Sequence, residues 1–323
     1  MQANRLTYPD ICKFIAIFIV TCSHSAQAIS GRTWTNFLGG TEIDIAFNMP
    51  LFMLMSGWFL NLDKLRSTNT FIYLFSKFKR LIIPAISWYF IYCIFTINIP
   101  TISSVLSFYW YLKALFICLG IIIVSAKLIK NDTLCFLIST IFVILCPHTN
   151  ILKINFMFPY LWTGYYLRKM IDSDKVKLIK TISILSLISG VVLSIYWDSS
   201  KSVYMSPFNI LEFNTQMLYS YIYRFAIGLF LSVFIIYVIK KFNEKIPNSL
   251  ASYGQYSLVI YTSSFVFNGL LSKILNHFNI HTNEYLILDL LSILTCIIII
   301  VLTISICKVA ERNKTAKLLL MGE

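Results

Sequence analysis

One apolar segment near the start of the chain carries three ionisable side chains whose types and spacing could support chemistry. Asp10, Lys13 and His24 interrupt a run that is otherwise rich in Phe, Ile, Val and Ala. In a helix, Lys13 and His24 would lie about three turns apart on one face, roughly 16 Å along the axis. Asp10 and Lys13 have the i,i+3 spacing of an ion pair. Because buried ionisable groups are costly, this stripe predicts a functional path; the alternative is a structural polar seam between helices.

Two further cations lie inside apolar runs. Lys113 and Arg224 are each predicted two or three turns below the outer surface of a membrane. Both side chains are long enough to reach the outer interface instead. Trp110 and Tyr111 stand beside Lys113 and could form either an interfacial belt or the wall of a pocket. These four residues are therefore candidates for a site, each with a structural alternative.

The second apolar run begins with acidic residues and contains an amide. Glu42 and Asp44 open it, and Asn48 follows within the run. Polar side chains at such depth usually face the interior of a helix bundle. We therefore include Asn48 among the candidates.

These residues must be positioned by a set of apolar helices. The sequence shows ten apolar runs, most of them long enough to cross a hydrocarbon core of about 30 Å. This pattern predicts an all-α polytopic membrane protein, a bundle of about ten transmembrane helices. The 133–147 and 154–168 runs are the shortest. The predicted spans are 8–29, 44–61, 80–98, 104–125, 133–147, 154–168, 178–197, 216–239, 255–275 and 284–307.

The distribution of basic residues among the segments between these runs predicts the orientation of the chain in the membrane. Most of the 27 Lys and Arg residues fall in segments on one side of the membrane, which places both termini in the cytoplasm. Lys77, Lys79 and Arg80 form a basic run at the start of the third span, where composition alone favours a cytoplasmic anchor. The net charge of +13 is then explained by topology and anionic lipid headgroups rather than by nucleic acid.

Several other classes of site find no support in the sequence. The eight cysteines lie in or at the ends of spans, without metal-ligand spacing, and are interpreted as small apolar packing residues. No GxSxG segment or phosphate-binding glycine loop occurs. His148, His277 and His281 are predicted in outer loops, where solvated surface histidines are the usual case. We expect no metal.

Five segments carry a resemblance to a known family. The segments are YPDICKFIAIFIVTCSHS (8–25), FNMPLFMLMSGWFL (47–60), FKRLIIPAISWYF (78–90), FYWYLKALF (108–116) and YGQYSLVIYTSSFVF (253–267). With these segments the chain resembles the integral-membrane acyltransferase 3 family, particularly its stand-alone sugar O-acetyltransferases, the fucose 4-O-acetylase-like branch. The spacing from Lys13 to His24 is similar to the family pattern of a basic residue followed eleven positions later by histidine.

Two positions depart from the family pattern. Many relatives have histidine where this chain has Asn48, before the MPLF segment. Many also have histidine shortly after the tyrosine of the SLxIY segment, where this chain has Thr262, Ser263 and Ser264. If those histidines contribute to catalysis in relatives, this chain must depend on His24 or act on a different substrate.

The resemblance implies a single acyltransferase domain over residues 1–323 that moves an acetyl group from cytoplasmic acetyl-CoA to a hydroxyl of a cell-surface or lipid-linked glycan. It implies that His24, Lys13 and Asp10 are catalytic, with His24 acting as a general base or transiently acetylated. Asp10 would keep Lys13 charged and oriented. The CoA phosphates would be bound by basic residues at the cytoplasmic mouth. The candidates are Lys13, Lys77, Lys79 and Arg80.

A tetrahedral oxyanion would need hydrogen-bond donors, and a bound acceptor would need side chains that form the walls of its pocket. The candidates are Asn48, Trp110, Tyr111, Lys113 and Arg224, and the sequence does not choose among them. The resemblance also implies a bacterial cytoplasmic membrane, with lipids and a glycan or glycolipid as partners. The main alternative is a polytopic transporter or flippase of a glycolipid or small solute, although the paired half-repeats typical of such proteins are not evident. A non-catalytic membrane scaffold is the second alternative.

Overall fold

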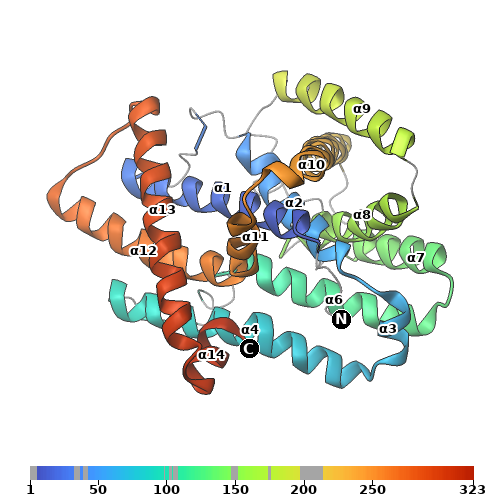
Figure 1. The fold of residues 1–323 in the computed structure, drawn as a ribbon, viewed down its shortest axis with the longest axis horizontal. Helices are drawn as coiled ribbons and strands as arrows, with labels where there is room; N and C mark the ends of the chain where they lie inside the picture. The colour runs from blue at the N-terminus through green and yellow to red at the C-terminus, as the bar shows by residue number, and fades with distance from the viewer. Residues whose placement is uncertain are drawn as a thin grey trace.

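The computed structural model describes residues 6–32, 37–38, 43–97, 99–101, 104, 108–146, 152–173, 176–196 and 214–323. Within these ranges every regular element is a helix, which confirms the predicted all-α class (Figure 1). Glu42 and His148, which the sequence analysis considered, lie outside the described residues.

Seven of the described helices are long and apolar enough to cross a membrane, so the chain is a polytopic membrane protein. They correspond to seven of the ten predicted spans, with ends that mostly agree within a few residues. These helices are α1 (Tyr8–Ser30), α4 (Thr70–Thr96), α6 (Trp110–Leu128), α9 (Val176–Ile195), α10 (Thr215–Phe242), α12 (Ser257–Phe278) and α13 (Tyr285–Ala310).

The other three predicted runs are shorter or less apolar helices. They are α2 (Asp44–Trp58), α7 (Asp132–Leu145) and α8 (Ile154–Asp172). Most side chains of α2 and α8 are buried against protein, so these two helices need less apolar surface than helices that face lipid. That all three cross the membrane, to make ten spans, stays a prediction.

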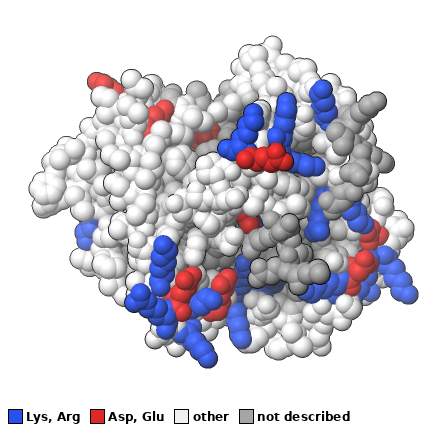
Figure 2. Space-filling view, in the orientation of Figure 1, with Lys and Arg blue, Asp and Glu red and all other residues white. Residues whose placement is uncertain are grey.

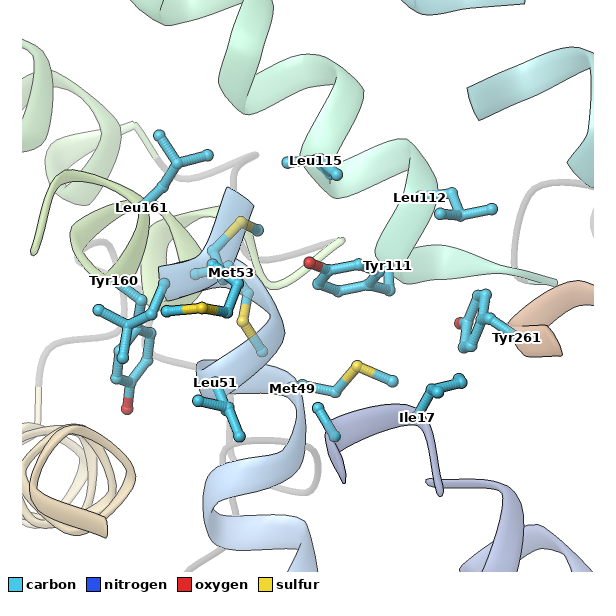
Figure 3. Packing of buried hydrophobic residues seen from close by; sticks show 14 of the residues in the cluster. Ile17, Met49, Leu51, Met53, Tyr111, Leu112, Leu115, Tyr160, Leu161 and Tyr261 are labelled. Carbon is cyan, nitrogen blue, oxygen red and sulfur yellow. The ribbon is translucent and has the colours of Figure 1, made fainter. Parts of the chain in front are cut away.

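The centre of the bundle is a close crossing of α2 and α8. A Cβ atom added to Gly57 would come within 1.8 Å of the Leu161 carbonyl oxygen, and one added to Gly164 would come within 2.0 Å of the Leu54 carbonyl oxygen. The two backbones therefore touch, as small residues allow in membrane bundles. Figure 3 shows Met53 of α2 between Leu161 of α8 and Tyr111 of α6.

Contacts between helix ends agree with the predicted alternation of sides. At the end where α1 begins and α10 ends, Thr7 Oγ1 donates to Asn243 Oδ1 at 2.8 Å. At the opposite end, Tyr223 near the start of α10 donates to the Leu193 carbonyl near the end of α9 at 2.7 Å. In Figure 2 basic side chains gather at the lower edge, the right and the upper middle, with acidic side chains among them, and the upper left, where α13 begins, carries acidic side chains.

A charged network joins the predicted cytoplasmic ends of three helices. Arg66, on the short helix α3 (Leu62–Ser67), donates to Asp132 at 2.8 Å, and Lys169 of α8 reaches the same carboxylate at 2.6 Å. The hydrogen bond to Asp132 raises the pKa of Arg66 above its ordinary value. The network fixes α3, α7 and α8 relative to one another at this face.

Besides α3, two further short helices were not predicted. They are α11 (Asn248–Gln255) and α14 (Lys314–Met321). Asn313 caps α14 by accepting from the Thr315 and Ala316 amides. From there α14 returns along α4, where Trp88 Nε1 donates to the Leu320 carbonyl at 3.1 Å. The end of the chain therefore packs against the helix that carries the basic run.

Two predicted helix starts were wrong. The helix predicted at 80–98 begins ten residues before its predicted start, at Thr70. Asn69 caps α4 at that point, and the amphipathic turns that follow continue the helix past Lys77. The helix of the 104–125 span, α6, begins at Trp110, because the left-handed backbone of Tyr109, with φ of 51°, interrupts the helical geometry at that residue. The basic run therefore lies on a helix rather than in a loop, and Lys113 lies about one turn from the start of α6 rather than two or three.

Candidate active site

His24 lies half-buried on α1, held on two sides. Its Nδ1 lies 3.2 Å from Oε1 of Gln27, one turn farther along the same helix. Its ring packs against the ring of Phe265 on α12, with centroids 4.5 Å apart. A half-buried imidazole with one nitrogen bound and its ring fixed by packing has a defined orientation, as a general base requires.

Phe265 belongs to an aromatic cluster that α6 and α12 build around this histidine. Its ring centroid lies 5.2 Å from that of Phe108, 5.2 Å from that of Tyr109 and 5.5 Å from that of Tyr261. The Tyr109 hydroxyl donates to the Thr262 carbonyl at 2.6 Å, which ties the start of α6 to α12. The residues at the start of α6 therefore pack against Phe265, the aromatic neighbour of His24.

Three candidates from α6 lie at this cluster. Lys113 Nζ donates to the backbone carbonyl of Phe108, and the Phe108 ring contacts Phe265, the neighbour of His24. Tyr111 is buried, with its ring 6.1 Å from that of Tyr261, and Trp110 packs edge-on against it at 6.0 Å. Figure 3 shows Tyr111 between α2 and Tyr261. That Trp110 and Tyr111 form the wall of a pocket, rather than an interfacial belt, stays a prediction.

The other two acceptor-side candidates lie deeper in the bundle. Asn48 is buried on α2, where its Oδ1 accepts from the Met49 amide at 2.6 Å. Arg224 is only 2% exposed on α10, so its side chain does not extend to the outer interface. Within the described part of the chain, neither residue makes a hydrogen bond to His24. Their role at the site stays a prediction.

The polar stripe on α1 continues to the opposite end of the helix. Lys13 Nζ lies 3.2 Å from Oδ1 of Asp10, which is 1% exposed, so the ion pair expected from the i,i+3 spacing is present. The same ammonium lies 4.0 Å from the centre of the Phe59 ring. Asp10 and Phe59 together hold Lys13 at the end of the bundle.

The basic run of α4 lies near Lys13. Lys77 is half-buried and experiences the positive charges of Arg80, Lys64 and Lys13. Lys79 points differently, with its ammonium 4.4 Å from the centre of the exposed Phe75 ring. A concentration of cations that repel one another is favourable only where an anion binds or solvent screens them.

A pocket of about 420 Å³ opens between α4 and the end of the chain. Its lining is mixed, with two cations, a hydroxyl, apolar side chains and a carboxylate that also pairs with Lys317 at 3.4 Å. Lys79 and Arg80 line it, whereas Lys13, Lys77 and His24 do not. The lining includes Ile72, Phe75, Ser76, Lys79, Arg80 and Glu323.

The structure thus brings the predicted residues together in two groups. His24 contacts Phe265, which links it through Phe108 and Tyr261 to the segment that carries Trp110, Tyr111 and Lys113, and the basic residues lie at the other end of α1. By helix rise the two groups are about 16 Å apart. A long, thin donor that binds by its charged end at the basic group would have to extend along α1 to reach His24.

The hydroxyl residues that replace histidine on α12 have structural roles. Ser263 shares a hydrogen bond of 2.7 Å with Thr303 on α13, and Ser264 donates to the Tyr261 carbonyl at 2.9 Å. Thr262 donates to carbonyls of the preceding turn. All three side chains are fully buried: Ser263 joins α12 to α13, and Thr262 and Ser264 bond within α12 itself.

Cysteines and the remaining histidines add no second site. All eight cysteines are free and seven are buried, in keeping with packing residues. Among the described residues, no group of three or more His, Cys, Asp or Glu side chains is placed to hold a metal ion. His277 lies in the last turn of α12 rather than in a loop, and His281 Nδ1 lies 3.1 Å from the Ile29 carbonyl.

Sequence reasoning missed four residues around the histidine, namely Gln27, Tyr109, Tyr261 and Phe265. One signal was present, because Gln27 follows His24 at i,i+3. The three aromatic residues lie within the 108–116 and 253–267 segments that carry the family resemblance. Their proximity to His24 depends on how α1, α6 and α12 pack, which no local pattern reveals.

Comparison with known proteins gives one match. The family model for acyltransferase 3, which is described as an acyltransferase domain, matches residues 6–310 of the sequence. Comparisons with curated proteins and with solved structures give no match.

Proposed function

The chain belongs to the acyltransferase 3 family, and we propose that this membrane acyltransferase moves an acetyl group from cytoplasmic acetyl-CoA to a hydroxyl of a cell-surface or lipid-linked glycan. The family match supports acyl transfer, and the apolar helices place it in a membrane. The acetyl donor, the glycan acceptor and the bacterial cytoplasmic membrane are parts of the proposal.

One arrangement carries the proposal. A single helix, α1, has a paired lysine amid cations at one end and an oriented histidine beside an aromatic wall farther along. CoA has several phosphates on one end of a flexible arm and a thioester on the other. The basic end would bind the phosphates through charge-assisted contacts, and the arm would follow α1 toward His24.

The residues at the basic end fit a polyphosphate. Lys79 and Arg80 line the pocket between α4 and the end of the chain, and Arg80 also acts on Lys77, next to Lys13. Arg80 therefore both lines the pocket and lies near enough to Lys77 to affect its charge. A ligand with more than one phosphate could contact all four cations at once, which would relieve their mutual repulsion.

His24 would act as the general base. Its free nitrogen takes the proton of the acceptor hydroxyl while the hydroxyl oxygen attacks the thioester carbonyl. The tetrahedral intermediate then collapses, the carbon–sulfur bond breaks, and the imidazolium returns the proton to the CoA thiolate. The products are the O-acetylated acceptor and free CoA. Transient acetylation of His24, followed by attack of the hydroxyl, is the alternative order.

The developing oxyanion needs a donor near the thioester. Among the candidates, Lys113 and Trp110 lie at the aromatic cluster, whereas Asn48 and Arg224 lie deeper in the bundle. The observed positions favour Lys113, which would exchange the Phe108 carbonyl for the oxyanion. Trp110 and Tyr111 would pack against the acceptor.

Release of CoA thiol tests the proposed reaction. Purified protein is mixed with acetyl-CoA and a surface-glycan extract, and free thiol is followed together with ester-linked acetate on the glycan. We expect both to appear in equal amounts. A transporter or a scaffold would produce neither, and that result would refute the proposal.

A further inference from the structure

Gln27 is the polar side chain in contact with His24. The amide is half-buried inside a membrane-spanning helix, where an unpaired polar group is costly. Its oxygen, Oε1, faces His24 Nδ1 at 3.2 Å. Within the described part of the chain, the structure shows no hydrogen bond to the other ring nitrogen, Nε2.

The atoms that face one another determine which nitrogen carries the proton. An amide oxygen can only accept, so Nδ1 must donate for the bond to form. A neutral imidazole has one N–H, and Nε2 is then the nitrogen with a free lone pair. The lone pair lies on the edge of the ring that points away from Gln27.

Packing restricts the ring further. Phe265 contacts the imidazole with an angle of 49° between the two ring planes. Phe265 is itself fixed, because its ring meets that of Tyr109 edge-on at 5.2 Å. Rotation of the imidazole about its own axis would lose the Gln27 bond and disturb this contact.

We propose that Gln27 is a positioning residue that holds His24 in the Nδ1–H tautomer and so presents Nε2 as the base toward the acceptor hydroxyl. The inference rests on the proposed function, because it assumes that His24 accepts the proton. Gln27 touches neither donor nor acceptor in this role. It acts through the orientation and tautomer of His24, as outer partners of histidine do at metal sites.

Two substitutions separate this role from a structural one. Gln27→Leu keeps the approximate volume and removes the acceptor. Gln27→Glu keeps an oxygen that can accept from Nδ1–H, and an ionised carboxylate cannot donate. If the amide were turned so that its NH₂ group donated to Nδ1, Gln27→Glu would fail as badly as Gln27→Leu. The pair therefore also tests the tautomer.

Ser25→Ala is the matched structural control. Ser25 lies two residues from Gln27 and donates to Asn268 on α12 at 2.9 Å, so its loss removes a buried interhelical hydrogen bond without touching His24. Each variant is purified in detergent, its melting temperature is measured, and kcat and KM for acetyl-CoA are determined with the glycan extract. His24→Ala is included.

We expect Gln27→Leu to lower kcat by roughly 10- to 100-fold, the loss typical for an outer partner of a functional histidine. KM for acetyl-CoA should change less than about twofold, and Gln27→Glu should recover most of kcat. Wild-type kcat in Gln27→Leu would overturn the inference, and so would equal loss in both Gln27 variants. An equal loss in Ser25→Ala would also overturn it, because general loosening of α1 would then explain the effect. If His24→Ala were fully active, the proposed function itself would fall.

Discussion

Lys13 and Arg80 are the residues at which the proposed donor binding can be tested separately from the proposed chemistry. Lys13 is held by Asp10 on one side and by the Phe59 ring on the other, and Arg80 acts on the neighbouring Lys77. Both lie near the end of the bundle away from His24. Their effect should therefore be on affinity for the charged end of acetyl-CoA rather than on the transfer step.

We expect Lys13→Ala and Arg80→Ala each to raise KM for acetyl-CoA about tenfold or more while kcat changes little. A hydrogen bond to a charged group contributes about 1.5–3 kcal/mol, and each 1.4 kcal/mol is about tenfold in affinity. Initial rates over a range of acetyl-CoA concentrations measure both constants.

Lys130→Ala is the matched control for these variants. Lys130 is an exposed cation on the same predicted side of the membrane, outside the pocket lining. Its removal should leave KM unchanged. An unchanged KM in both Lys13→Ala and Arg80→Ala would contradict binding of the donor at this end.

At the scale of residues, the sequence predicted contacts between side chains that are spaced along one helix. The Asp10–Lys13 pair follows from helical spacing alone, and the structure confirms it. The aromatic cluster could not be predicted in this way. Tyr109 reaches Thr262, 153 positions away, through a backbone turn that no spacing rule identifies. Contacts of that kind depend on tertiary packing.

At the scale of elements, the crossing of α2 and α8 determines where the acceptor-side residues lie. Asn48 is on α2, and Tyr111 packs against Phe52 of the same helix, with ring centroids 5.6 Å apart. If α2 were pushed away from α8, both positions would shift. The two glycines of the crossing, Gly57 and Gly164, should therefore tolerate no side chain.

Gly57→Ala should destabilise the protein by roughly 1–3 kcal/mol or more, the usual cost of overpacking. The new methyl group would overlap the Leu161 carbonyl, at 1.8 Å. Gly120→Ala is the matched control, because the nearest neighbour of its added Cβ is the Leu74 side chain at 3.7 Å. Alanine should stabilise that helical position by about 0.5–1 kcal/mol.

Melting temperatures of the two purified glycine variants in one detergent check this prediction. Gly57→Ala should melt several degrees below wild type, and Gly120→Ala at or above it. Equal melting temperatures for Gly57→Ala and wild type would show that α2 and α8 do not touch at this point.

The elements themselves were largely predictable because long apolar runs must be satisfied by helices in a membrane. The errors have local physical causes. Hydropathy falls in the basic turns of α4, so the sequence suggested a start at position 80 rather than at Thr70. The short helices α3, α11 and α14 are six to eight residues long and outside the spans, where hydropathy carries no signal.

At the scale of the whole molecule, function depends on sidedness. The proposed donor is cytoplasmic, so the basic end of α1 must face the cytoplasm. Positive charge at that end and the contacts between helix ends agree with this orientation. The loop between α12 and α13, which contains Asn283, should then face outward, and the segment that contains Ser249 should face inward.

Cysteine labelling checks the orientation. Seven native cysteines are buried, so Cys146→Ser gives a background of low reactivity. In intact cells a membrane-impermeant maleimide should label Asn283→Cys and leave Ser249→Cys unlabelled until the membrane is opened. The reverse pattern would place the basic end outside and would exclude cytoplasmic acetyl-CoA as the donor at that end.

Transfer of labelled acetate in inside-out membrane vesicles tests the central claim most directly, that His24 accepts the proton of the acceptor hydroxyl. Acetyl-CoA is supplied to the exposed cytoplasmic face, and acetate on the glycan is counted at equal protein amounts for wild type, His24→Ala and His277→Ala. General acid–base catalysis contributes about 10²–10⁴-fold, so His24→Ala should fall at least 100-fold while His277→Ala, an exposed histidine near the end of α12, keeps the wild-type rate. A wild-type rate in His24→Ala would contradict the account.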